Sequence, residues 1–233
     1  MRMQLFCLAQ IVFVLSANAQ SDPNSGSYGK LLPYHPAPPH YLGDLFATVI
    51  EPKPYADIEG SVFLDENWML ASLVLPGNKV IDSISIRMNL FENKIHFKDV
   101  RGKELQAGVP VLGIQIIDTN SKWQNAVFLS GLKEDPGAFF QILSNGNKIK
   151  LLKKISIRKW ESKSFGVQRK WFEAEEKLFL FANGNLSMSN KNCSILTELF
   201  GDNKKILQFI SSNNLRCNRE EDMKKLVEYF NIL

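Results

Sequence analysis

The stretch of residues 138–157, AFFQILSNGNKIKLLKKISI, constrains the fold more than any other part of the chain. Apolar and polar residues alternate on both sides of Asn145-Gly146. An Asn-Gly pair between apolar runs is a strong signal for a tight hairpin, because both residues tolerate the positive φ that such a turn needs. We therefore expect two antiparallel strands joined at Asn145-Gly146, and a second hairpin of the same kind at Asn183-Gly184.

Similar strand-like runs fill residues 58–190, separated by turn residues at intervals of about 8–12 positions, a spacing typical of all-β sandwiches and barrels. The polar, glycine-containing segment from Trp160 to Arg169 is expected to be a loop. The pattern predicts an α+β fold: an antiparallel sheet, sandwich or partly open barrel of roughly nine to eleven strands with a C-terminal helical cap.

The helical cap is predicted over residues 191–233, where the apolar period changes. Met223, Leu226, Val227 and Phe230 recur at helical spacing, with charged residues between them. Helices this short are not stable alone, so they are expected to pack on the β-domain. Residues 20–57 hold seven of the ten prolines and are predicted to be an extended, Pro-rich arm.

Residues 1–19 have the pattern of a secretory signal peptide. A basic start at Arg2 precedes an apolar run and the small-residue site Ala17-Asn18-Ala19. The run is too short for a membrane span, and no later stretch reaches the length that one needs. We expect a mature chain that begins at Gln20, has no transmembrane helix, and lies in the periplasm or outside the cell.

Two cysteines remain after this cleavage, Cys193 and Cys217. Export to an oxidising compartment permits a disulfide between them, and two free buried thiols are the alternative. A zinc site would need three or four ligands, and no histidine is near either cysteine in the sequence. No metal or other cofactor is predicted.

The sequence has no nucleotide-binding, metalloprotease or serine-hydrolase motif, so we do not expect an enzyme. His96 alternates with Ile95 and Phe97, which predicts an exposed histidine on the polar face of a strand. The net charge of +4 forms no dense basic stripe and no known nucleic-acid module is present, so nucleic acid is not an expected partner.

Asp65, Glu66 and Trp68 are the candidate ligand cluster. In sugar-active sites an aromatic ring stacks on the sugar and carboxylates serve as acid and base. A turn before a strand explains the same residues. Ser83, in Asp82-Ser83-Ile84, matches a short O-glycosylation pattern, and Asn185 and Asn192 each begin an N-x-S acceptor pattern.

Three stretches carry a resemblance to a group of uncharacterised secreted or periplasmic proteins of Bacteroidota. They are Gly60-x-x-Phe63-Leu64-x-x-x-Trp68, the segment from Phe140 to Lys154, and the tail from Ser194 to Asn231. The end of the signal peptide is similar as well. This family has no assigned activity, so the resemblance implies an exported location and no catalytic residue.

The sequence therefore predicts an exported, non-catalytic cell-envelope protein that binds a protein or a small ligand. One alternative is a half-barrel carrier of an acyl chain or another apolar ligand, suggested by the many apolar residues on strand faces. The other alternative is a carbohydrate-active enzyme that uses Asp65 or Glu66.

Overall fold

A computed structural model describes residues 45, 48–50, 55, 57–164, 166–189, 195, 196, 199 and 204–232. All of them belong to one compact unit, which spans Pro36–Leu233. The predicted signal peptide, most of the Pro-rich arm, Asn192 and Cys193 lie outside the described residues.

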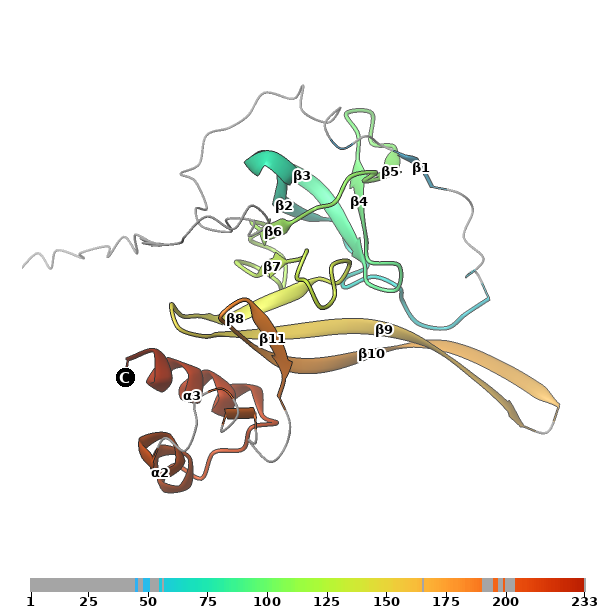
Figure 1. The fold of residues 1–233 in the computed structure, drawn as a ribbon. Coiled ribbons are helices and arrows are strands. Elements are labelled where there is room, and N and C mark those ends of the chain that lie inside the picture. The colour runs from blue at the N-terminus through green and yellow to red at the C-terminus, as the bar shows by residue number, and fades with distance from the viewer. Residues whose placement is uncertain are drawn as a thin grey trace, which may run out of the picture. The chain divides into compact units, whose positions relative to one another are not determined.

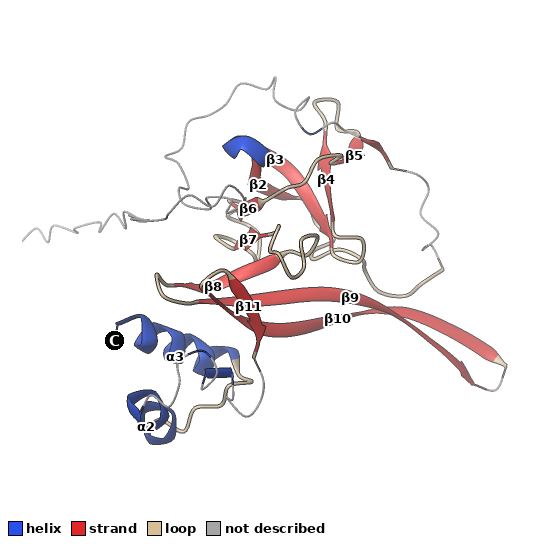
Figure 2. Ribbon diagram, viewed as in Figure 1, coloured by secondary structure: helices blue, strands red, loops and turns tan. Residues whose placement is uncertain are grey.

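The described strands form one antiparallel sheet of eleven strands, in the order β1-β5-β4-β3-β2-β6-β7-β8-β9-β10-β11 (Figures 1 and 2). The edge strands β1 and β11 lie at opposite ends of this order, so the sheet is open. The strands are β1 (Thr48–Val49), β2 (Met69–Leu75), β3 (Lys79–Asn89), β4 (Lys94–Lys98), β5 (Glu104–Gln106), β6 (Gly113–Ile116), β7 (Val127–Leu129), β8 (Phe140–Asn145), β9 (Lys150–Ser164), β10 (Val167–Ala182) and β11 (Asn185–Met188).

Two helices whose bounds the structure describes follow the sheet, α2 (Lys204–Ser212) and α3 (Glu220–Ile232). The predicted α+β class, with an antiparallel, partly open sheet and C-terminal helices, is confirmed. A 3-10 turn, η2 (Pro76–Asn78), joins β2 to β3.

Separate apolar clusters cover the two ends of the sheet. The larger one packs the buried residues of β2, β3, β4 and β6. At the other end Leu151 and Leu152, both fully buried, belong to different clusters. Because adjacent residues of a strand point to opposite faces, β9 is covered on both faces at this point.

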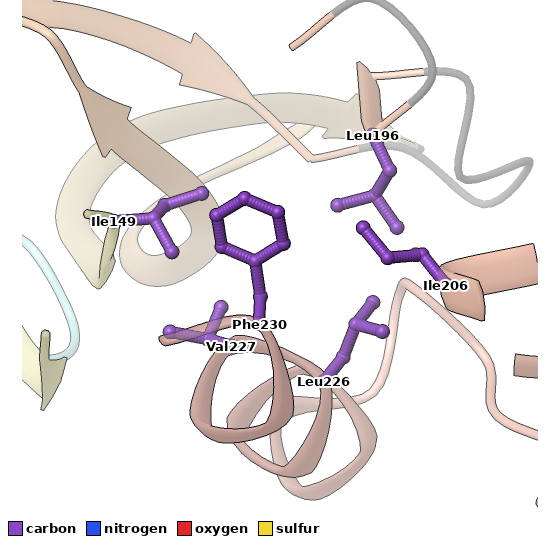
Figure 3. Close-up of a pocket in the computed structure, with 6 residues that line it drawn as sticks. All are labelled: Ile149, Leu196, Ile206, Leu226, Val227 and Phe230. Carbon is purple, nitrogen blue, oxygen red and sulfur yellow. The ribbon is translucent and has the colours of Figure 1, made fainter. Parts of the chain in front are cut away.

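The helices cover one of these faces. Leu226, Val227 and Phe230 of α3 meet Ile149, just before β9, and Ile206 of α2 (Figure 3). The space enclosed by these side chains has no room for a water molecule. The described parts of α2 and α3 therefore pack together, and α3 packs on the sheet.

The two Asn-Gly pairs have different outcomes. Asn183 and Gly184 have φ values of 52° and 78° and form the tight turn between β10 and β11, as predicted. The antiparallel hairpin predicted around Asn145-Gly146 is confirmed, since β8 pairs with β9. The tight two-residue turn is wrong, because residues 146–149 form a four-residue loop between the two strands. Gly146 does not have a positive φ.

Gly146 has a different role, which involves α3. The Asn231 side chain accepts hydrogen bonds from the backbone N–H groups of Lys148 (3.0 Å) and Ile149 (3.2 Å), and its amide donates to the carbonyls of Ile149 and Val227. A Cβ on Gly146 would overlap the Asn231 amide. Glycine is therefore required here so that α3 can approach the loop between β8 and β9 closely.

We predict that Gly146→Ala lowers the free energy of unfolding by about 1–3 kcal/mol, the usual range for overpacking. Gly137→Ala is the matched control, because a Cβ there meets no neighbour. The cost of Gly146→Ala should shrink in an Asn231→Ala background, since the overlapping amide is then absent. Urea unfolding of the four combinations measures this, and an equal cost in both backgrounds would contradict the assignment.

Candidate functional site

The outer part of the β9–β10 hairpin runs beyond the other strands to a free end (Figure 1). We call it the ribbon, defined as residues 158–164 of β9 and 167–173 of β10. Every described residue from 158 to 169 is exposed. The predicted loop from Trp160 to Arg169 is therefore wrong: seven cross-strand pairs, from Arg158–Glu173 to Ser164–Val167, continue the ladder through it. At 3.4 Å per residue the ribbon is about 20 Å long.

The ribbon combines exposed apolar side chains with excess positive charge. Trp160 lies opposite Trp171, and Trp160 and Val167 are 45% and 70% exposed. The Arg169 guanidinium lies 6.0 Å from the centre of the Trp171 ring. The ribbon has five basic and two acidic residues, a net charge of +3 in a chain whose total is +4. The basic residues are Arg158, Lys159, Lys163, Arg169 and Lys170, and the acidic ones are Glu161 and Glu173.

A two-stranded ribbon is only marginally stable by itself, so its attachment matters. Glu59 forms an isolated parallel bridge with Trp171: its N–H donates to the Lys170 carbonyl (3.1 Å), and its carbonyl accepts from the Phe172 N–H (2.8 Å). Arg169 also donates to both oxygens of the Glu59 carboxylate, and these hydrogen bonds lower the pKa of that carboxyl.

An aromatic cluster reinforces this attachment. Tyr55, Phe91 and Phe172 make three edge-to-face contacts, with ring centres 5.1–5.5 Å apart. Gly60, with φ 88°, lies against the Phe172 carbonyl, which a Cβ would approach to 2.7 Å. We call residues 55–60 the clamp. It ties the base of the ribbon to the loop after β3, so the ribbon is held by this contact as well as by its continuation into the sheet.

The candidate cluster of Asp65, Glu66 and Trp68 is divided among separate contacts. Asp65 accepts a hydrogen bond from the Asn67 N–H (3.0 Å), as in a turn, and its other oxygen lies 3.6 Å from the Lys122 ammonium. Glu66 is exposed. The Trp68 ring lies under two cations, Arg87 and Lys98, at 4.5 and 4.6 Å. These positions support the turn interpretation for the two acids.

His96 is fully buried, so its predicted exposure on the strand is wrong. Its Nδ1 donates to Glu104 Oε1 at 2.7 Å, because a carboxylate only accepts. Arg87 Nη2 lies 2.7 Å from each oxygen of the same carboxylate, and its guanidinium is 4.2 Å from the centre of the Phe63 ring. Residues 62–64 pair antiparallel with the end of β3, where the Leu64 N–H donates to the Met88 carbonyl. The Phe63 ring packs edge-to-face on His96, on the face that was predicted to be exposed.

The Glu104 carboxylate is stabilised in its charged form. Burial raises its pKa, but the hydrogen bonds from His96 and Arg87 and the charge of Arg87 outweigh burial, so the pKa is lowered from its ordinary value of 4.5. The three groups contact one another, and Arg87 and His96 also contact aromatic rings. The cluster therefore contributes to the stability of this part of the sheet.

The remaining predicted positions in the described part of the chain are Cys217, Ser83 and Asn185. Cys217 is buried and disulfide-bonded, and its pairing with Cys193 stays a prediction. Ser83 is exposed, with φ 55°, at a bulge where β3 shifts register against β2. Asn185 is exposed at the start of β11. Glycosylation of either residue stays a prediction.

Comparisons of the chain with protein-family models, with curated proteins and with solved structures find no match. Within the described ranges, no helix combines the length and apolar character needed to cross a membrane.

We predict that Gly60→Ala loosens the ribbon. The substitution combines an unfavourable positive φ, which costs about 1–2 kcal/mol, with a clash against the Phe172 carbonyl. Amide hydrogen exchange of residues 158–173 should accelerate. Gly102→Ala is the control, because Gly102 has a similar φ of 77° and open space around its Cα. If both variants leave exchange in the ribbon unchanged, the clamp does not hold it.

We predict that Glu104→Gln costs about 1–2 kcal/mol of stability at pH 7, because Arg87 and His96 lose their anionic partner. A carboxyl whose folded-state pKa is lowered stabilises the fold above its ordinary pKa and loses this effect as pH falls through the folded-state value. The stability gap between wild type and Glu104→Gln should therefore close as pH falls below about 4.5. Urea unfolding across pH 3–7 tests this, with the exposed Glu66→Gln as control; a gap that stays constant would contradict it.

Proposed function

We propose that the chain is an exported, non-catalytic protein of the cell envelope that binds an acidic partner protein through the ribbon. The observation that carries the proposal is an ordered, clamped ribbon on which Trp160 and Val167 are exposed and Trp171 is half-buried, with five basic side chains around them. The pattern of residues 1–19 supports export.

The residue types of the ribbon are those that dominate binding energy at protein interfaces. Tryptophan and arginine are enriched among such residues, and here Arg169 lies beside the Trp160–Trp171 pair. Arg158 and Arg169 pair with Glu175 and Glu59, which lie outside the ribbon, so five basic and four acidic groups leave a net charge of +1 there. This smaller excess still favours approach to an acidic surface. Together these properties indicate an interface in which aromatic side chains supply the binding energy and charge attracts the partner.

The distribution of charge favours a protein over a lipid bilayer as the partner. Strand alternation places Arg158 and Arg169 on the face of the tryptophans, and Lys159, Lys163 and Lys170 on the opposite face. A flat headgroup surface contacts one face of the ribbon at a time, so it leaves the cations of the other face in water. A protein groove can place carboxylates against both faces.

The carrier and enzyme alternatives have less support. The apolar residues that suggested a carrier pack into three clusters, and the described void between α3 and the sheet is filled by side chains (Figure 3). Asp65 is engaged in a turn and with Lys122, apart from the cations that hold Trp68.

We predict that a photo-reactive amino acid in place of Trp160 cross-links the full chain to a specific acidic protein in the envelope of its own cells. The same amino acid in place of Leu207 of α2, which is 48% exposed, is the matched control and should give no such adduct. The adduct should be lost in Trp171→Ala and weakened at about 1 M salt, where charges are screened beyond about 3 Å.

Two results would contradict the proposal. One is equal cross-linking at positions 160 and 207, which would indicate non-specific contact. The other is binding of the purified chain to anionic lipid vesicles in place of a protein adduct, which would make the ribbon a membrane-contact element.

A further inference from the structure

The ribbon has two backbone edges, one along each strand, and the clamp occupies the edge of β10. Glu59 donates its N–H to the Lys170 carbonyl and accepts from the Phe172 N–H, so these two residues direct backbone groups away from β9. Successive residues of an antiparallel strand alternate in this respect, hence Trp171 bonds its cross-strand partner Trp160. The ribbon therefore already accepts a third segment of backbone on one side.

The opposite edge, along the outer part of β9, is open in the described part of the chain. Because Trp160 bonds β10, its neighbours on either side direct their N–H and C=O groups away from β10. These outward-facing residues are Lys159, Glu161 and Lys163. β8 pairs with β9 only as far as Lys154, and among the described residues no isolated bridge continues along this edge.

The strands at the two ends of the sheet order are short. β1 has two residues and β11 has four. On β11 the Leu186 N–H donates to the Glu134 carboxylate (3.2 Å), which satisfies one edge group. Native proteins protect long edges, because unpaired N–H and C=O groups invite another strand. The outer part of β9 instead combines length, exposure and unpaired backbone groups at one edge.

The side chains along this edge determine which strand can join it. Lys159 and Lys163 lie on one face and Trp160 lies on the other. Within the described residues the ion pairs of the ribbon are made by Arg158 and Arg169, and neither of the two lysines has one. Exposed edge lysines discourage pairing with an arbitrary strand, whereas carboxylates directly opposite them would attract.

We propose that the acidic partner binds by adding an extended strand, antiparallel, to the outer edge of β9. This inference rests on the proposed function of the ribbon and specifies the segment of the partner that it takes. In an antiparallel ladder an outward-facing residue exchanges two hydrogen bonds with the residue opposite, so the three outward residues of β9 offer about six. Backbone hydrogen bonds of this kind give affinity, and the alternating side chains give specificity.

The side chains of β9 predict a pattern for that segment, in chain order: acidic, any, neutral, apolar, acidic. The first acidic residue lies opposite Lys163 and the last opposite Lys159, since opposite charges pair favourably across strands. The neutral residue lies opposite Glu161, whose carboxylate also accepts a hydrogen bond from the Gln168 amide. The apolar residue lies opposite Trp160, because an aromatic ring packs well against a β-branched side chain.

The first test uses the purified chain and two synthetic peptides as probes. The acidic peptide is Thr-Glu-Thr-Thr-Val-Glu-Thr with blocked ends, and the control peptide has lysine in place of both glutamates. When the acidic peptide is saturating, we expect amide hydrogen exchange at Lys159, Glu161 and Lys163 to slow at least about tenfold. Exchange at Trp160 and Ser162 should change much less, because β10 already bonds these N–H groups. The control peptide should protect neither set.

Two proline variants separate the edges of the hairpin. Glu161→Pro removes an outward N–H from the β9 edge and places a ring against the incoming strand, so the acidic peptide should bind at least about tenfold more weakly. Ala174→Pro removes an outward N–H from the β10 edge, beyond the ribbon, and should leave binding unchanged. Glu161→Gln removes the same negative charge but keeps the N–H, so it should bind the acidic peptide more tightly.

Two results would overturn the inference: no protection of the outward N–H groups by the acidic peptide, or equal losses of affinity in the two proline variants. Photo-cross-linking from position 160 in the native envelope separates this inference from the proposed function. We expect Glu161→Pro to lose the protein adduct and Ala174→Pro to keep it. An adduct that forms equally in Glu161→Pro would reject strand addition and leave the ribbon as the binding surface. No adduct without either proline would reject the proposed function, and this inference with it.

Discussion

The rest of the structure depends on the pairing of β9 with β10. Fifteen cross-strand pairs form one register from Lys150–Phe181 to Ser164–Val167. On one face the inner pairs pack against α3, and on the other face they belong to a second apolar cluster. The outer pairs form the ribbon. Because a slip by one residue would turn every side chain to the opposite face, the buried inner pairs also fix which face presents Trp160.

The outer half of the hairpin has no core of its own, so its order must come from elsewhere. The clamp supplies it through two backbone hydrogen bonds at Glu59 and the edge-to-face contacts of Phe172. Gly60 permits this close approach. A surface that is ordered before binding loses less conformational entropy on binding, which is how a slender ribbon can serve as a specific contact.

The sequence predicts the fold class and the helical cap well, because the period of apolar residues changes where strands give way to helices. The prediction fails at the ribbon because both of its faces are exposed. Apolar and polar residues therefore do not alternate there, and no pattern marks residues 158–169 as strand. Asn183-Gly184 lies at a tight turn, as its residue types indicate, but Gly146 is required by Asn231, a contact 85 positions away along the chain that no local pattern shows. The burial of His96 is missed likewise, because Phe63, which packs against its ring, lies 33 positions away along the chain.

Amide hydrogen exchange of the whole chain, measured alone and with a detergent extract of the envelope of its own cells, tests the central claim most directly. In the free protein we expect slow exchange along the cross-strand ladder of residues 158–173, slower than in a free hairpin, because the clamp holds it. Addition of the extract should slow exchange further, and only in the ribbon. Fast exchange in the free ribbon, or added protection confined to other elements, would contradict the claim that this ribbon is a preformed binding surface.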